Sequence, residues 1–128
     1  MVKAILINTL LFLSVIYAYS AEKWVFVSGD GVTNVYYDER SVIYDTNFNC
    51  YTVYFKYENL KSDTLSNGKV LTSQCFLYNY YCSTKRSLLL EIKEIYSDNT
   101  FEYLSPTKQT NYISANSPEV KVFESFCK

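Results

Sequence analysis

The strongest constraint on the fold is a tyrosine-rich segment with a period of two, CYTVYFKYENL at residues 50–60. The alternation puts four apolar or aromatic side chains on one side of an extended chain, namely Tyr51, Val53, Phe55 and Tyr57. Tyrosine and β-branched residues favour strands, and the other side of the segment is more polar. We therefore expect a half-buried antiparallel strand.

A polar stretch at residues 61–69, KSDTLSNGK, separates this strand from a second β-rich run at residues 70–81. If the two runs form a hairpin, the residue numbers of every facing pair have the same midpoint, which lies in the turn. The midpoint of Cys50 and Cys75 falls inside the polar stretch. We therefore expect a cross-strand disulfide between them, which would contribute about 3 kcal/mol by restricting the unfolded chain.

Shorter strands are predicted at residues 24–27, 35–37 and 101–104, each bounded by turn-forming residues. A glycine-containing turn is expected at residues 28–31. Residues 83–96 are ambiguous, because the spacing of their apolar side chains alone favours a helix.

A helix is predicted over residues 118–126. Ser117 is a suitable N-cap, Pro118 occupies the first helical position, where its missing N–H is not needed, and Glu119 lies near the positive end of the helix.

Three consecutive charged residues, Asp38, Glu39 and Arg40, follow the predicted strand at residues 35–37. Paired carboxylates beside a guanidinium are one way to build an active site. A carboxylate directly after a strand is also well placed to accept backbone N–H groups two or three residues ahead. We interpret Asp38 as a corner that holds a turn, with Glu39 and Arg40 as its solvated neighbours.

The first 20 residues have the pattern of a secretory signal peptide. Lys3 precedes a continuous apolar run, and small residues surround the expected cleavage position near Ser20. The run is shorter than the roughly 20 residues that cross a bilayer. We expect residues 21–128 to form a single exported domain, in the periplasm, at the cell surface or secreted, with no membrane span after cleavage.

Four cysteines, and no histidine, limit the chemistry. An even number of cysteines in an oxidising compartment indicates two disulfides, whereas a zinc site is disfavoured because no C-x-x-C pair exists. Without histidine, a Ser-His or Cys-His nucleophile is impossible. A carboxylate pair of the glycosidase type stays open, but Glu91 and Glu94 are more simply a solvated edge. We expect no enzyme, cofactor or metal.

The tyrosine content bears on whether the chain binds other proteins. The chain contains 14 tyrosines, and tyrosine offers a large, stiff contact area with a polar tip, although strands also use tyrosine for packing. The net charge of −1 argues against a nucleic-acid partner. The candidate protein-binding residues are Tyr78, Tyr80, Tyr81, Lys85 and Arg86.

Several short motifs resemble the bacterial surface-adhesin protein E family. They are an early Trp24, the run YYDERSV at residues 36–42, Cys82 before a basic pair, and the ending ISANSPEVKVFESFC at residues 113–127. The chain departs from that family at Ala115 and Asn116, where the family usually has proline and glycine, and its signal lacks the lipid-attachment cysteine of the lipoprotein that gives the family its name.

The resemblance implies a six-stranded antiparallel sheet with the C-terminal helix on its concave face, tied there by a disulfide between Cys82 and Cys127. It also implies that residues 85–96 form a strand, and we adopt that interpretation over the helical spacing. The fold class expected is α+β.

The function implied is an exported, non-enzymatic module that contacts host extracellular-matrix or plasma proteins such as vitronectin or laminin, with a homodimer as one arrangement. The alternative is a periplasmic inhibitor or accessory protein, for example a lysozyme inhibitor, acting through the loop at residues 61–69.

Overall fold

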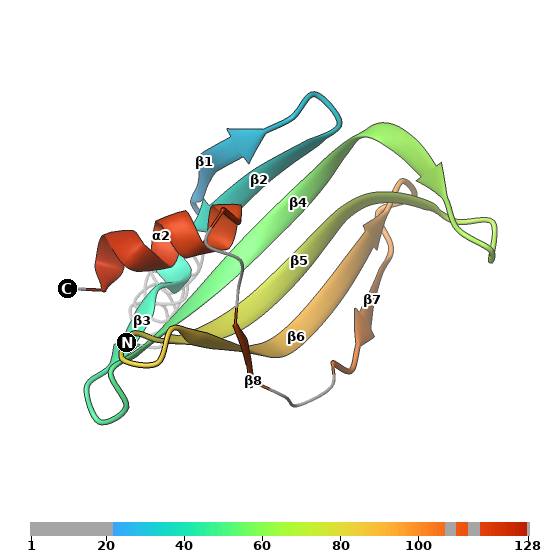
Figure 1. Ribbon diagram of the computed structural model, residues 1–128. Coiled ribbons are helices and arrows are strands. Elements are labelled where there is room, and N and C mark those ends of the chain that lie inside the picture. The colour runs from blue at the N-terminus through green and yellow to red at the C-terminus, as the bar shows by residue number, and fades with distance from the viewer. Residues whose placement is uncertain (1–21, 107–109, 113–115, 128) are drawn as a thin grey trace, which may run out of the picture.

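The computed structural model describes residues 22–106, 110–112 and 116–127. The predicted signal peptide lies outside these residues. Within them, eight antiparallel strands form one sheet, and a single α-helix follows (Figure 1). The strands are β1 (Trp24–Gly29), β2 (Thr33–Asp38), β3 (Ile43–Asp45), β4 (Cys50–Thr64), β5 (Val70–Tyr81), β6 (Arg86–Tyr96), β7 (Phe101–Leu104) and β8 (Thr110–Tyr112); the helix is α2 (Pro118–Phe126).

The sheet is open, and its main path runs β1-β2-β4-β5-β6-β7. Two further strands lie off this path, since β3 pairs with β4 and β8 pairs with β6. The prediction of six strands is therefore wrong for the described chain, which has eight. The two additional strands have three residues each, too few for an alternating pattern to reveal them in the sequence.

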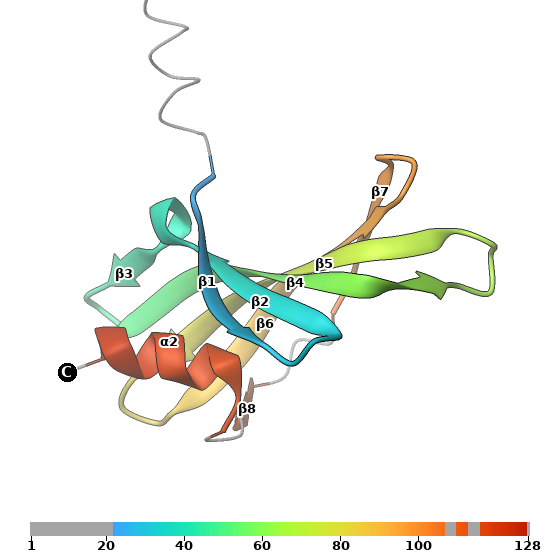
Figure 2. The ribbon, with the colours of Figure 1, turned by 90° about the horizontal axis from the view of Figure 1, so that it is seen from above.

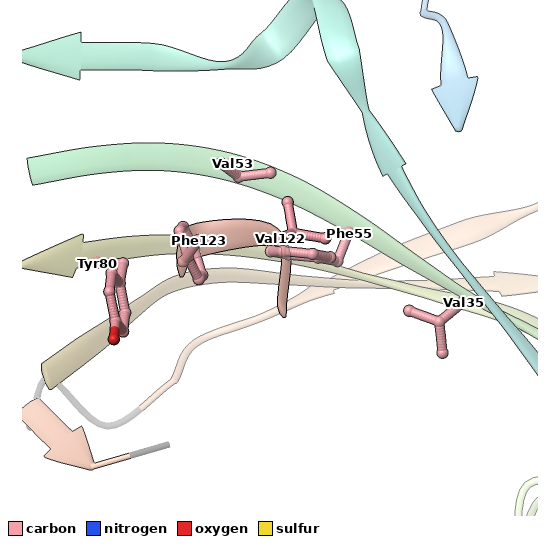
Figure 3. Close-up of a cluster of buried hydrophobic side chains, with 6 residues drawn as sticks. All are labelled: Val35, Val53, Phe55, Tyr80, Val122 and Phe123. Atoms are coloured by element: carbon pink, nitrogen blue, oxygen red, sulfur yellow. The ribbon is translucent and has the colours of Figure 1, made fainter. Parts of the chain in front are cut away.

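The alternation in β4 is confirmed, because its odd-numbered residues face the helix. Val53 and Phe55 are completely buried and pack with Val122 and Phe123 of α2 (Figure 3). Figure 2 shows α2 on one side of the sheet, near the end of β4 that contains Cys50. The helix therefore closes the core on one face of the sheet.

The β4–β5 hairpin is confirmed, but its predicted register is wrong. β4 continues through the polar residues to Thr64, and a short turn follows, closed by a hydrogen bond from Leu65 N to Lys69 O at 2.8 Å. Gly68 in this turn has φ of 82°, which glycine adopts without strain.

In this register Cys50 faces Tyr81, and Cys75 faces Lys56. Six residues of strand separate the two cysteines, which is about 20 Å at 3.3 Å per residue. Both are buried free thiols, so the predicted disulfide between Cys50 and Cys75 is wrong.

Residues 86–96 form strand β6, as the resemblance implied and against the helical spacing. A β-bulge explains why the apolar pattern is misleading. Neighbouring residues Leu77 and Tyr78 of β5 pair with Glu91 and Leu89 of β6. Leu90, between these two, has no partner in β5 and forms the bulge. The bulge shifts the alternation by one position in mid-strand.

The C-terminal helix has the predicted bounds and the predicted cap. Ser117 Oγ accepts a hydrogen bond from Val120 N at 3.3 Å, and Pro118 begins the helix. The disulfide between Cys82 and Cys127 is present and ties the end of α2 to the β5–β6 turn. A closed loop of 45 residues contributes about 4 kcal/mol by chain-entropy reasoning. In the described part of the chain, no helix has the length and apolar character needed to span a bilayer.

Candidate protein-binding face

The sheet face opposite α2 has one row of side chains in a common register. The row crosses all six strands of the main path, because residues paired across neighbouring antiparallel strands project to the same side. It consists of Phe26, Tyr36, Lys56, Cys75, Lys93 and Tyr103. We call the side of the sheet that carries this row the open face.

Both lysines of the row lie against aromatic rings. Lys56 Nζ is 4.6 Å from the centroid of the Trp24 ring and 5.1 Å from that of Tyr36. On the other side of the row, Lys93 Nζ is 4.4 Å from the Phe101 centroid and 5.7 Å from that of Tyr103. These are favourable cation–π distances. Within the described residues, neither ammonium group forms an ion pair with a carboxylate, so both keep hydrogen-bond donors for a partner.

Cys75 lies between the two lysines and is only 3% exposed. Burial raises the pKa of its thiol to about 11, although Lys93 and Lys56 act in the opposite direction. The thiolate is the nucleophilic form of cysteine, and it is scarce at neutral pH when the pKa is raised. Cys75 therefore provides an apolar centre to the row.

Carboxylates border the row on both sides. Glu58 follows Lys56 by two residues in β4, and Glu91 precedes Lys93 by two residues in β6, so both project to the open face. The residues around the row thus combine cations, anions and several aromatic rings. Aromatic side chains are enriched at protein–protein interfaces, whereas a nucleic-acid backbone needs clustered positive charge.

The candidate residues predicted from the sequence do not gather into one surface. Tyr80 is 1% exposed beneath α2, and its hydroxyl donates to Glu124 at 2.7 Å. Burial, with this hydrogen bond, raises the pKa of Tyr80 to about 12. Tyr78 packs against the same core, whereas Tyr81 projects to the opposite side of β5. Lys85 and Arg86 are exposed at the β5–β6 turn.

Sequence reasoning missed the open-face row. Its members come from six strands, and only the period of two in each strand gives a signal. Finding the row requires the pairing register of the strands. The register predicted for β4 and β5, from the midpoint of Cys50 and Cys75, is wrong.

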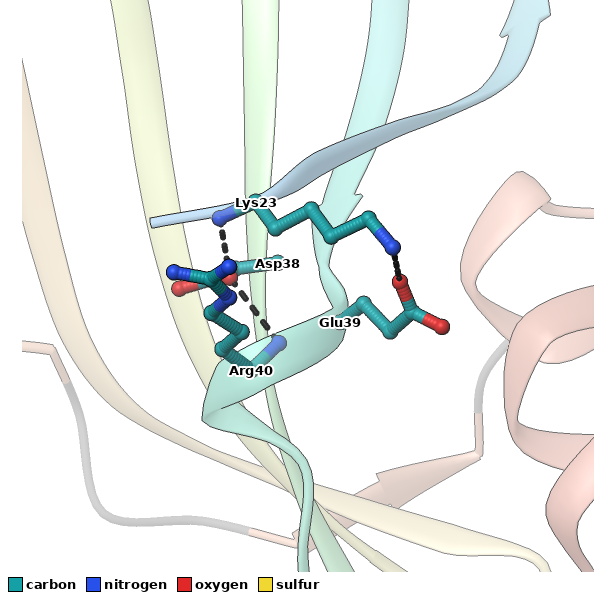
Figure 4. A network of polar contacts seen from close by, with 4 residues as sticks. All are labelled: Lys23, Asp38, Glu39 and Arg40. Atoms are coloured by element: carbon teal, nitrogen blue, oxygen red, sulfur yellow. Dashed lines mark hydrogen bonds and ion pairs between the residues drawn. The ribbon is translucent and has the colours of Figure 1, made fainter. Parts of the chain in front are cut away.

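Asp38 is a corner, as predicted (Figure 4). Its Oδ1 accepts hydrogen bonds from Lys23 N at 2.9 Å and from Arg40 N at 3.1 Å. Ser41 Oγ donates to the backbone oxygen of Asp38 at 2.8 Å, which closes the short 3-10 helix Glu39–Ser41. Glu39 is exposed and pairs with Lys23 Nζ at 2.7 Å. The charged run therefore joins β1, β2 and the next turn.

Among the described residues, no group of three or more histidine, cysteine, aspartate or glutamate side chains is arranged to hold a metal ion. Comparison with protein-family models, curated proteins and solved structures gives no match to this chain.

Proposed function

We propose that this protein is an exported, non-enzymatic binding module that contacts another protein through its open face. The observation that carries the proposal is the row of aromatic side chains and lysines across six strands. Aromatic residues dominate the energy of many protein interfaces, and a lysine held on a ring loses little conformational freedom on binding. The partner class suggested by the resemblance is a host matrix or plasma protein such as vitronectin or laminin.

The test is binding of the oxidised protein, residues 21–128, to immobilised vitronectin and laminin, measured by surface plasmon resonance. The informative variant is Lys56→Gln with Lys93→Gln, which removes the two cations of the row. We expect its affinity to fall about tenfold or more, since these ammonium groups lie at the centre of the face.

The matched control is Lys69→Gln with Lys121→Gln. It removes the same charge, and Lys69 Nζ also lies over a ring, that of Tyr96 at 4.7 Å. Lys121 is exposed on α2, away from the open face. Equal loss of affinity in both double variants would indicate a general charge effect and contradict the proposal.

The β4–β5 hairpin supports a second candidate function, inhibition of an enzyme such as lysozyme. The hairpin extends beyond the region covered by α2 (Figures 1 and 2), and a tight turn at Leu65–Lys69 ends it. A rigid projection of this kind suits insertion into an active-site cleft. Deleting Ser66 and Asn67 should abolish inhibition of lysozyme if this function holds, and should leave binding through the open face intact.

A further inference from the structure

The loop between β3 and β4 holds an aromatic side chain out in solvent. Four residues, Thr46 to Asn49, connect the paired residues Asp45 and Cys50. Phe48 in this loop is 66% exposed, more than any other large hydrophobic side chain in the described part of the chain. Single exposed apolar side chains are common on folded proteins, so the case for a role of Phe48 rests on how its loop is held and on what surrounds it.

Hydrogen bonds from its own polar groups support the conformation of the loop. Asp45 Oδ1 accepts a hydrogen bond from Asn47 N at 2.9 Å, and the Tyr44 hydroxyl donates to Asn49 Oδ1 at 2.9 Å. Cys82 N donates to Asn49 O at 3.0 Å, which fastens the loop to the end of β5. Asn49 has φ of 47°, a left-handed conformation that asparagine tolerates better than most residues.

Aromatic contacts connect the base of the loop to the helix. The Tyr44 and Tyr51 ring centroids are 4.6 Å apart, and the Tyr51 ring stacks on Phe126 of α2 at 5.4 Å. The Tyr51 hydroxyl also donates to Phe126 O at 3.1 Å. The next residue, Cys127, forms the disulfide with Cys82, so the loop is braced from both sides of its base.

From this arrangement we infer that Phe48 is an anchor residue, which inserts into an apolar pocket of the partner protein. The inference rests on the proposed function and names a second part of the same contact. The loop lies at the end of the sheet, about 20 Å along β4 from Lys56, and Ile43 in the adjoining strand pairs with Thr52 and projects to the open face. Asp45 is exposed beside the anchor, so the pocket that fits best has a basic rim.

Rigidity is what makes Phe48 suited to this role. Ordering a flexible loop on binding costs free energy, whereas a loop already ordered by hydrogen bonds avoids part of that cost. Buried aromatic anchors of this kind commonly account for most of the affinity of an interface.

The experiment compares Phe48→Ser with Val32→Ser for binding to immobilised vitronectin and laminin. Val32 is also exposed, at 48%, and lies in the β1–β2 turn beside Leu60, at the far end of β4. We expect Phe48→Ser to weaken binding about tenfold or more and Val32→Ser to change it less than about twofold. Phe48→Leu, which keeps an apolar side chain, should restore part of the affinity. Both exposed sites leave the core untouched, which circular dichroism will verify.

The outcomes separate this inference from the proposed function. One outcome is that wild-type protein binds, that Lys56→Gln with Lys93→Gln weakens this binding, and that Phe48→Ser leaves it unchanged. In that case the anchor role is overturned and the open-face role stands. If wild-type protein binds neither vitronectin nor laminin, both are overturned. If Phe48→Ser loses only adsorption to phosphatidylcholine vesicles, with protein binding intact, Phe48 serves a membrane surface and the inference is wrong.

Discussion

The ring of Tyr80 in β5 stacks on the ring of Phe123 in α2, with centroids 4.6 Å apart and ring planes 12° from parallel. Phe55 of β4 also contacts Phe123, edge to face, with centroids 5.5 Å apart. Three aromatic rings from two strands and the helix thus form the centre of the core. Tyr80 was predicted to bind a partner, but its position makes it a structural residue.

Replacing Phe123 by alanine should destabilise the protein by about 3–5 kcal/mol, because the substitution leaves a cavity between the helix and the sheet. Equilibrium unfolding in urea, followed by circular dichroism, measures the change. Phe101→Ala is the matched control, since Phe101 is largely exposed. A similar loss of stability in both variants would show that Phe123 is not part of a packed core.

Thiol titration should distinguish the observed cysteine arrangement from the one predicted by the sequence. In native protein we expect neither Cys50 nor Cys75 to react quickly with Ellman's reagent, since both thiols are buried and burial raises the pKa of each. In denaturant without reductant, two thiols per chain should react. A count of zero would mean that Cys50 and Cys75 are joined after all, and peptide mapping would then identify the bond.

Glu119, in the first turn of α2, should make stability depend on pH. Burial raises the pKa of its carboxyl above the ordinary 4.5, and its own backbone N–H acts to a smaller extent in the other direction. The folded protein therefore holds this proton more tightly than the unfolded chain does. The resulting contribution to stability is complete below the unfolded pKa and is lost as the pH rises through the folded pKa.

The variant Glu119→Gln removes this dependence. We expect it to be more stable than wild type at pH 7 and to approach wild-type stability below about pH 4. Urea unfolding at pH 4, 5, 6 and 7 gives the comparison, with Glu39→Gln as the exposed control. A wild type that is the more stable protein at pH 7 would contradict a raised pKa for Glu119.

Asp38→Ala should cost about 1–3 kcal/mol, because it leaves the N–H groups of Lys23 and Arg40 without their acceptor. Asp38→Asn keeps an oxygen in the same place and should cost less. Thermal unfolding of both variants tests the order. Glu39→Ala breaks only the exposed pair with Lys23 and should cost less than about 1 kcal/mol; if it costs as much as Asp38→Ala, the corner depends on the ion pair.

Local patterns predicted the elements whose signals are local. The period of two in residues 50–60 identified the buried face of β4, and Ser117 with Pro118 identified the start of α2. The cap of α2 depends on contacts within one segment. The alternation in β4 depends on which side chains of one segment face water and which face the core. Neither requires knowledge of a partner strand.

Register depends on information that the segments themselves do not contain. Residues 61–64 are polar because the end of the β4–β5 hairpin lies beyond the helix, and composition alone cannot distinguish such a strand from a loop. Because the turn lies further along the chain than predicted, Cys75 faces Lys56 across the hairpin and not Cys50. The same error hid the open-face row, because Lys56 and Lys93 become neighbours of Cys75 only in the true register.

The burial of two thiols protects the one disulfide of the described chain. A free thiolate can attack a disulfide sulfur and exchange partners with it. Cys50 and Cys75 are enclosed in the sheet, and burial raises the pKa of both thiols, so neither readily supplies a thiolate that could attack the bond between Cys82 and Cys127. The folded sheet thereby keeps this bond from shuffling.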